Sequence, residues 1–221
     1  MTIERTVPEE RSPESGRPVG FRVQSGIPPK ERGRAAALYA RALARDMAPL
    51  VGGGTNARRG ATWVRHAMRP ESALVILDKR GSVAALAGLS FGEGGFLRPD
   101  RRQMRRIWGR LGGQMRWWRW QGWPAGPETA ALVIDGIAVA EQHRRRGFGR
   151  ALVQAAEAYA RATGRPALRA EIAANNDAAI RFWSQLGFQP VARLHGARLL
   201  FPRIPADVIV MERPVGTAPV P

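Results

Sequence analysis

The sequence predicts an α/β or α+β protein built on one mixed sheet. Two apolar strands at 73–77 and 83–89 flank Asp78–Gly81, a tetrapeptide typical of a hairpin turn, so this pair is antiparallel. Further along, an expected helix connects the strands at 130–139 and 167–173. Because a helix that crosses between two strands implies that they run parallel, the same sheet contains both kinds of pairing.

The remaining elements follow from polarity patterns and from residues that start or stop helices. Residues 19–25 alternate in polarity like a half-buried strand, and Pro28–Pro29 favour a helix start. Thr55 and Asn56 can cap a helix that ends before Pro70. Besides those already named, the expected elements are helices at 28–47, 55–66 (or to 68), 148–163 and 176–186, and strands at 188–193 and 207–212.

The chain shows no internal repeat and no strong domain boundary, which favours one domain over 19–213. Residues 92–127 differ in composition and are interpreted as an insertion in that domain. We expect a disordered N-terminal tail over 1–18 and a flexible C-terminal tail over 214–221. Residues 1–18 have no apolar run, and no segment has the length and apolarity of a membrane span, so we expect a soluble, cytoplasmic protein.

The composition excludes several classes of protein. The 221 residues contain no cysteine, which excludes a disulfide scaffold, a thiolate metal site and a cysteine nucleophile. The histidines are only His66, His143 and His195, widely separated, so we expect no metal site. The net charge of +17 comes from 33 arginines and two lysines against 18 acidic residues. Coding bias explains much of this total, so only local clusters of charge indicate a binding partner.

One such cluster follows the strand at 130–139. The chain reads Ile137-Ala-Val-Ala-Glu-Gln-His-Arg-Arg-Arg-Gly-Phe-Gly-Arg150, so a strand ends and a basic, glycine-containing loop opens a helix. Glycines allow close approach of the main chain, and a helix start presents unpaired N–H groups to an anion. The spacing lacks the lysine of a Walker loop and the three glycines of a dinucleotide fingerprint. The loop is therefore either a phosphate site or a solvated basic turn.

These residues resemble the acyl-CoA pyrophosphate loop of the GNAT superfamily of N-acetyltransferases. Downstream, Glu171-Ile-Ala-Ala-Asn-Asn176, Ala179-Ile180, Phe182-Trp183 and Leu186-Gly187-Phe188 resemble further blocks of the family in the same order. The last strand, 207–212, is similar to the family's closing strand. The resemblance covers about residues 130–213, and it is closest to the protein N-terminal (ribosomal-protein alanine) acetyltransferases.

The resemblance implies a mostly antiparallel sheet in which two parallel strands splay apart, with acetyl-CoA bound as co-substrate in the gap. It assigns the pantetheine arm to the main chain of Ile137, Ala138 and Val139. It assigns a cofactor contact to Asn176, which can also cap the helix that follows it. The pyrophosphate is assigned to Arg144, Arg145, Arg146, Gly147, Phe148, Gly149 and Arg150.

Acyl transfer to an amine needs a base, because only the neutral amine attacks a thioester. Glu171 matches the position of a carboxylate proposed as base in the similar N-terminal acetyltransferases; the alternative is a strand carboxylate that faces water or pairs with Arg169. Asp135, two residues before Ile137, is the second candidate; it could instead position the acceptor amine or close a core hydrogen bond. Trp183 stands where the family usually has a tyrosine that protonates the departing sulphur. Indole N–H donates a hydrogen bond but no proton near neutral pH, so the general acid is unassigned.

The insertion at 92–127 holds eight arginines, two acidic residues and five of the seven tryptophans. A helix is expected from Pro99–Asp100, interrupted at Gly112–Gly113 and resumed over 114–120. The favoured interpretation is an amphipathic hairpin that packs on the sheet as a lid on the acceptor side. Membrane-surface association and docking to RNA are alternatives, whereas sequence-specific DNA binding is disfavoured because no base-reading motif is present.

The sequence thus predicts an acetyl-CoA-dependent N-acetyltransferase whose acceptor is a primary amine of a small molecule or protein N-terminus. A non-catalytic acyl-CoA-binding module and a basic adaptor acting through 92–127 are the alternatives. Neither the acceptor nor the oligomeric state, monomer or homodimer, follows from the residues.

Overall fold

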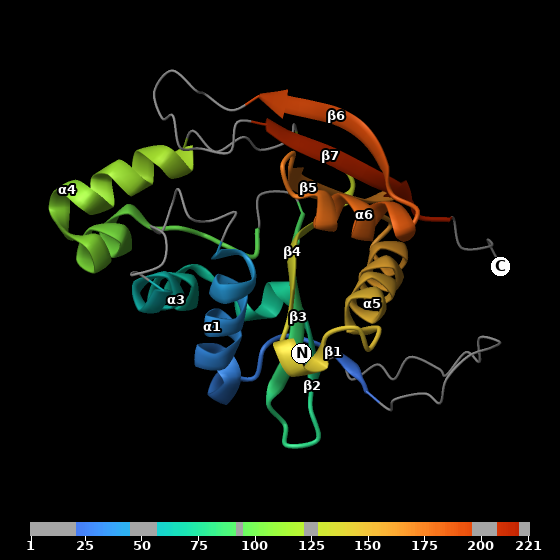
Figure 1. Ribbon diagram of the computed structural model, residues 1–221, viewed down its shortest axis with the longest axis horizontal. Helices are drawn as coiled ribbons and strands as arrows, with labels where there is room; N and C mark the ends of the chain where they lie inside the picture. Colours follow the sequence, from blue (N-terminus) through green and yellow to red (C-terminus); the bar gives the residue numbers. More distant parts are fainter. Residues whose placement is uncertain (1–20, 45–56, 92–94, 122–127, 196–206, 217–221) are drawn as a thin grey trace.

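The computed structural model describes residues 21–44, 57–91, 95–121, 128–195 and 207–216. The predicted tail at 1–18 and the residues from 217 lie outside this part, as do the expected helix end near Met47 and the cap at Thr55–Asn56. A seven-stranded sheet with the order β1-β2-β3-β4-β5-β7-β6 forms the centre of the molecule (Figure 1). All neighbours pair antiparallel except β4 and β5, so the predicted mixed, mostly antiparallel sheet is confirmed.

The elements follow the predicted order closely. The strands are β1 (Val23–Ser25), β2 (Ala73–Leu77), β3 (Val83–Ser90), β4 (Leu132–Val139), β5 (Ala167–Ala173), β6 (Gln189–His195) and β7 (Asp207–Pro214). The α-helices are α1 (Arg32–Ala42), α3 (Ala57–Ala67), α4 (Arg101–Gln121), α5 (Phe148–Ala162) and α6 (Asp177–Gln185). Short 3-10 turns occur at Pro29–Glu31, Pro70–Ser72 and Glu141–His143. β7 runs two residues beyond the predicted strand end, and Val215 after it is still buried.

The parallel pair at the centre of the sheet separates part-way along its length. Leu132, Val133 and Ile134 of β4 pair with residues 168–170 of β5, and the pairing then stops. From Asp135 onward β4 remains paired only with β3. The predicted splay between two parallel strands is therefore present, and it leaves one edge of β4 open.

Asp135 is the extra residue of a β-bulge in β4. Leu89 of β3 lies opposite Ile134, and the next pair is Gly88 opposite Gly136, so Asp135 has no counterpart on β3. Gly136 has a φ of 149° and lies against α1, where an added Cβ would stand 2.9 Å from Leu43 Cδ1 and 3.1 Å from the Tyr39 hydroxyl. Bulges of this kind re-aim a side chain relative to the regular strand.

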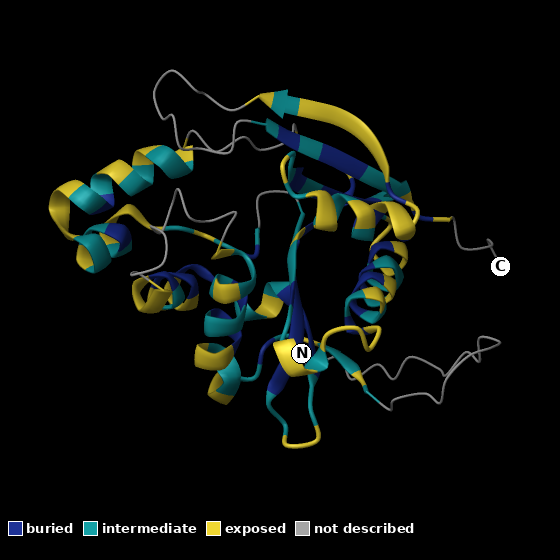
Figure 2. Cartoon of the chain, viewed as in Figure 1, coloured by how far each residue is buried: buried dark blue, intermediate teal, exposed yellow. Residues whose placement is uncertain are grey.

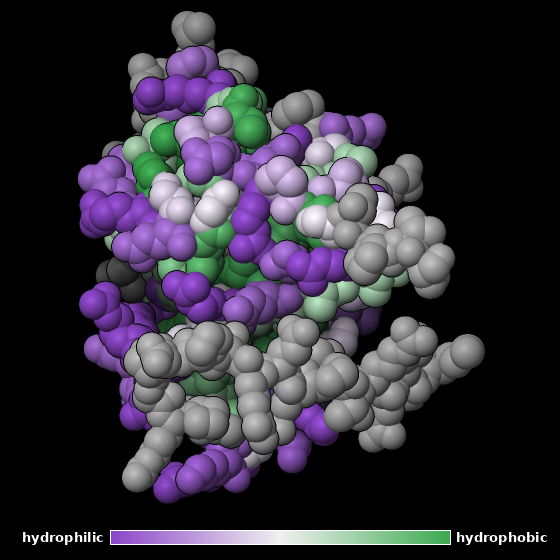
Figure 3. All heavy atoms as spheres, turned by 90° about the vertical axis from the view of Figure 1, so that its right-hand side faces the viewer, coloured by the Kyte–Doolittle hydropathy of each residue, from purple (hydrophilic) through white to green (hydrophobic). Residues whose placement is uncertain are grey.

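Each face of the sheet carries its own hydrophobic core. α5 and α6 cover one face and pack on Leu132, Leu168, Ile172 and Phe188. α1 and α3 cover the other face and α4 packs on α3 (Figures 1 and 2), and the core on this side includes Trp63. On the side of the molecule that bears α5 and α6, hydrophilic side chains dominate the described surface, with apolar ones showing between them (Figure 3). No described helix combines the length and the apolarity that crossing a membrane requires.

The helix of the insertion bends at a different glycine from the one predicted. Gly109 has a φ of 78° and a ψ of 171°, which breaks α4 into two arms. Such a positive φ is accessible to glycine and costly for other residues. Gly112 and Gly113, where the sequence predicted the interruption, are helical, so that prediction was wrong. Gly113 serves a different purpose, because its missing side chain lets the second arm rest on the backbone of Met104 and Arg105 in the first.

We expect Gly113→Ala to destabilise the protein. An added Cβ would stand 2.5 Å from backbone atoms of Met104 and Arg105, so the two arms must move apart. At Gly112 the same Cβ would meet only side-chain atoms, at 3.4 Å or more. Gly112→Ala is the matched control, and it should stabilise the helix by up to about 1 kcal/mol through alanine's higher helix propensity. Thermal unfolding measures both; equal Tm values for the two variants would contradict the close contact.

Candidate active site

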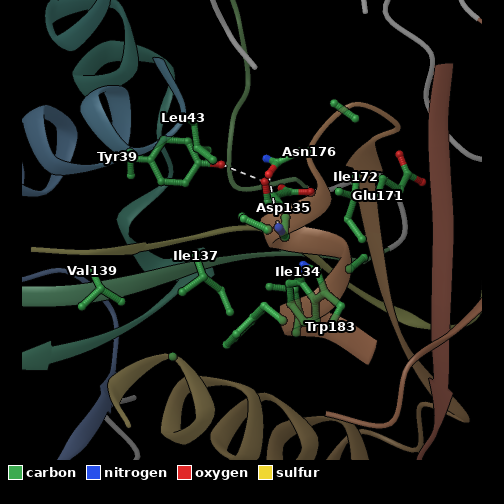
Figure 4. A pocket seen from close by; sticks show the side chains of 18 of the residues that line it. Tyr39, Leu43, Ile134, Asp135, Ile137, Val139, Glu171, Ile172, Asn176 and Trp183 are labelled. Carbon is green, nitrogen blue, oxygen red and sulfur yellow. Dashed lines mark hydrogen bonds between the residues drawn. The ribbon is translucent and has the colours of Figure 1, made fainter. Parts of the chain in front are cut away.

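A cavity of about 1220 Å³ opens where β4 and β5 separate. One end is lined by the loop between β4 and α5 and by the start of α6. The other end is lined by Tyr39 of α1 and Leu43 just after it, by Leu97, and by Trp120 and Gln121 of α4. Figure 4 shows side chains of β4, β5, α1 and α6 that meet around it. The cavity thus connects the glycine-arginine loop with the helices of the opposite face.

The loop at the α5 end has the backbone conformation of an anion site. Arg145 has a φ of 61° and Gly147 a φ of 80°, and Gly147 is the residue that precedes the first turn of α5. An added Cβ at Gly147 would meet no protein atom within 4 Å, so space is available next to the helix start. The unpaired N–H groups of the first turn and the arginines of the loop both favour a phosphate there. The residues present therefore fit the pyrophosphate of an acyl-CoA.

Most of the residues predicted from the sequence line this cavity. They are Asp135, Ile137, Val139, Arg144, Arg145, Gly147, Phe148, Gly149, Arg150, Glu171 and Asn176. Ala138 and Arg146 do not: the Ala138 side chain is buried in the core beneath α1 and α3, and Arg146 is exposed outside the lining. Asn176 accepts a hydrogen bond from the backbone N–H of Ala179 at 3.2 Å, so its expected role as a helix cap is confirmed.

Asp135 projects from the bulge into the cavity and is held at one oxygen. The Ser90 hydroxyl donates a hydrogen bond to Asp135 Oδ2, and the Phe96 backbone N–H donates to the same oxygen at 3.1 Å. The Phe96 N–H also lies 3.2 Å from Ser90 Oγ. Both donors bind Oδ2, and no described residue donates a comparable hydrogen bond to Oδ1. The carboxylate is therefore oriented with Oδ1 available to a partner in the cavity.

The surroundings of Asp135 change its acidity. Asp135 is exposed toward the cavity, and desolvation of the carboxyl by the surrounding protein raises its pKa above the ordinary aspartate value by disfavouring the charged form. The hydrogen bonds from Ser90 and Phe96 stabilise the carboxylate and offset part of that rise in the pKa. A carboxylate with a raised pKa is a stronger proton acceptor once it is ionised.

Tyr39 supports the bulge from the opposite side. Its side chain is buried, and its hydroxyl donates a hydrogen bond to the backbone carbonyl of Asp135 at 3.0 Å (Figure 4). The Tyr39 ring lies edge-on to Phe96, with the ring centroids 5.0 Å apart. Sequence reasoning missed Tyr39, Ser90 and Phe96, because they are distant from Asp135 in the chain and belong to no motif.

Glu171 lies on β5, beyond the point where the parallel pairing ends, and opposite Val210 of β7. In Figure 4 its carboxylate points away from Asp135. Arg169, its alternative partner in the sequence analysis, has Nε 2.7 Å from Glu212 Oε1 on β7. The two candidate carboxylates therefore occupy different positions on the cavity wall.

Trp183 of α6 lines the cavity and is itself 5 % exposed. Its ring lies edge-on to Phe188, at a centroid distance of 4.8 Å, and near Phe182. Within the described residues no three histidine, aspartate or glutamate side chains gather in a way that could hold a metal ion.

Comparison with known proteins places this chain in a family. Residues 55–188, more than half of the chain, match the model of the acetyltransferase (GNAT) family. The chain belongs to the GNAT acetyltransferase family. It is therefore a GNAT-family enzyme, which uses acetyl-CoA to acetylate an amine. No curated protein matches the sequence significantly.

Solved GNAT structures share the fold of this protein at low sequence identity. Ard1 from Thermoplasma volcanium is 22 % identical with a TM-score of 0.54, over 90 % of this chain and 99 % of its own. The ribosomal-protein-S18-alanine N-acetyltransferase from Escherichia coli is 17 % identical with a TM-score of 0.50, over 90 % and 96 % of the two chains. YncA from Salmonella typhimurium, solved with its cofactor acetyl-CoA, is 17 % identical with a TM-score of 0.53, over 91 % and 97 %. These values support the GNAT-like fold of the chain.

Proposed function

We propose that this GNAT enzyme transfers the acetyl group of acetyl-CoA directly to a primary amine of a small molecule or of a protein N-terminus. Acetyl-CoA and the amine bind together, and no covalent acyl-enzyme forms. Acetyl-CoA supplies the thioester carbon that the amine attacks, and CoA leaves as its thiol.

The position of Asp135 carries this proposal. Its carboxylate projects into the cavity where β4 and β5 part, between the loop at the start of α5 and the α1–α4 end. A cationic ammonium entering from the α1–α4 end would meet this carboxylate, which is oriented by Ser90 and Phe96. The attraction between the two opposite charges favours binding of the ammonium beside Asp135.

In this proposal Asp135 is the base. One carboxylate oxygen is held by its two donors, and the other takes a proton from the ammonium, which leaves a neutral amine beside the thioester. The main chain of Ile137 and Val139 on the open edge of β4 aligns the pantetheine arm, and the loop from Arg144 to Arg150 holds the pyrophosphate. Glu171 is the alternative candidate for the base. Asn176 contacts the co-substrate while it caps α6.

The departing sulphur needs little help from the protein. A free thiol has a pKa of about 8.5, so its thiolate leaves readily compared with an alkoxide. We propose that the indole of Trp183 or a water molecule donates a hydrogen bond to the sulphur, because Trp183 lines the cavity at the position equivalent to the family's tyrosine.

Release of free CoA thiol from acetyl-CoA tests the proposal directly. Small primary amines and short peptides with free N-termini form the panel, and N-acetylated versions of the same acceptors are the controls. We expect thiol release with at least one free amine and none with its acetylated form. Binding of CoA, seen as a higher Tm, without turnover of any acceptor would contradict transfer and favour an acyl-CoA-binding module instead.

A further inference from the structure

The outward face of the second arm of α4, residues 110–121, carries an apolar stripe that the fold does not use. Leu111 is 85 % exposed, Met115 44 % and Trp118 56 %. Their spacing of four and three residues puts the three side chains on one side of the helix. Only one other large apolar side chain in the described part of the chain, Val191 on β6, is comparably exposed.

This stripe is not a poorly packed piece of the core, because the opposite side of the same arm already packs well. Gly113 rests on the backbone of the first arm, and Trp117 and Trp120 pack on the core beneath α1 and α3. The Trp120 ring lies 6.0 Å from that of Trp63, edge-on. The hairpin thus has an inner face that packs on the core beside α3, and an outer face left to solvent (Figure 2).

Exposed arginines are numerous on α4 and on its neighbour α3. On α4 the exposed ones are Arg101, Arg102, Arg106 and Arg110, and α3, which packs on α4, adds Arg58 and Arg59. Asp100 is the only acidic residue in the described segment 95–121. Arg116 stacks over the Trp108 ring, and desolvation together with repulsion from Arg119 and Arg59 lowers its pKa. Positive charges therefore lie close enough together to repel one another, and a polyanionic surface would relieve that repulsion.

We propose that this outer face of α4 docks on the surface of an anionic lipid bilayer. Leu111, Met115 and Trp118 enter the boundary between headgroups and acyl chains, and exposed arginines of α4 bind lipid phosphates. Aliphatic side chains such as Leu111 and Met115 do not stack on bases, which favours lipid over RNA. Two positively charged copies of the face repel each other, which favours lipid over a second copy of the chain.

Flotation of the full chain with lipid vesicles tests the proposal. We expect binding to vesicles of phosphatidylcholine mixed with phosphatidylserine, much weaker binding to phosphatidylcholine alone, and loss of binding at high salt. The variant Leu111→Gln, Met115→Gln, Trp118→Gln should bind the mixed vesicles at least about tenfold more weakly, because it has no apolar side chains to insert. Val191→Gln, which removes an exposed apolar side chain on β6, is the matched control and should bind like the parent.

Two further measurements keep the result clear. The triple variant should keep its Tm and its thiol-release activity, since none of its three positions lines the cavity. If the triple variant does not fold, the double variant Arg106→Glu, Arg110→Glu replaces it and should abolish binding to the mixed vesicles. Equal vesicle binding by parent and triple variant would overturn the proposal. So would binding to single-stranded RNA in the absence of vesicle binding, or a concentration-dependent dimer that the triple variant abolishes.

Discussion

Asp135→Asn is expected to lower kcat for amine acetylation about 100-fold or more, because an amide cannot take the proton from the acceptor ammonium. The asparagine oxygen can still accept the hydrogen bonds from Ser90 and Phe96, so the bulge and the cavity keep their shape. Steady-state thiol release at saturating acetyl-CoA measures kcat, and the Kd for CoA should stay near that of the parent. A variant that retains the parent's kcat would exclude Asp135 as the base.

Glu171→Gln is the comparison that separates the two candidate carboxylates. If Asp135 is the base, Glu171→Gln leaves the acid limb of the pH–rate profile in place. If Glu171 is the base, its glutamine variant loses that limb and Asp135→Asn keeps it. Because the two residues lie at different points on the cavity wall, the two variants should not have the same effect.

The raised pKa of Asp135 predicts the direction in which kcat/KM changes with pH. The base is active only when ionised, so kcat/KM should rise with pH through this pKa, which lies above the ordinary aspartate value. In Ser90→Ala the carboxylate loses a donor that lowers its pKa, so the rising limb should move to higher pH. Ser90→Thr keeps a hydroxyl and should restore the limb. A purely structural role of Ser90 would change kcat or Tm without moving the limb.

Replacing Asp135 by asparagine should change the stability of the fold in the opposite direction to the activity. The folded-state pKa of Asp135 is raised above the unfolded-state value, so any stability linked to its proton is present at low pH and is lost as the pH rises through the folded pKa. At neutral pH the ionised carboxylate therefore destabilises the fold. Asp135→Asn should raise Tm at neutral pH, and the gain should shrink as the solution is acidified.

Gly147→Val is expected to abolish CoA binding. A valine would place its side chain in the open space beside the first turn of α5, where we propose that the pyrophosphate binds. It would also have to adopt a φ of 80°, which is strained for a β-branched residue. Titration calorimetry with CoA measures the change in Kd.

Gly164→Val is the matched control for the strain. Gly164 follows the other end of α5 with a φ of 68°, and an added Cβ there also meets no atom within 4 Å. Both variants should lose similar stability, but only Gly147→Val should lose CoA. Unchanged CoA affinity in Gly147→Val, or an equal loss in Gly164→Val, would contradict the pyrophosphate assignment.

Much of this fold could be predicted from the sequence, because many of its elements are determined by residues that are adjacent in the chain. The hairpin at Asp78–Gly81, the helix start after Gly147 and the cap at Asn176 each depend on a few adjacent residues. The order of the motifs within residues 130–213 then indicated the family, and the helix that connects the strands at 130–139 and 167–173 indicated that they run parallel.

The missing parts depend on contacts between distant segments. The Asp135 bulge is visible only in its register with β3, and its partners Tyr39 and Ser90 lie 96 and 45 residues away in the chain. In α4 the helix could break at Gly109 or at Gly112–Gly113. Glycine lowers the helix propensity by the same amount whether it bends the helix or makes room for a neighbouring segment. Only the contact of Gly113 with the first arm distinguishes the two roles.

If Asp135 is the base, the bulge also separates the chemistry of this enzyme from the integrity of its sheet. Because Ile134 and Gly136 already face consecutive residues of β3, the loss of the single codon for Asp135 would join them into a regular ladder. No other side chain of β4 would change the face on which it lies. Deletion of Asp135 would therefore remove the proposed base while the pairing of β4 with β3 is kept.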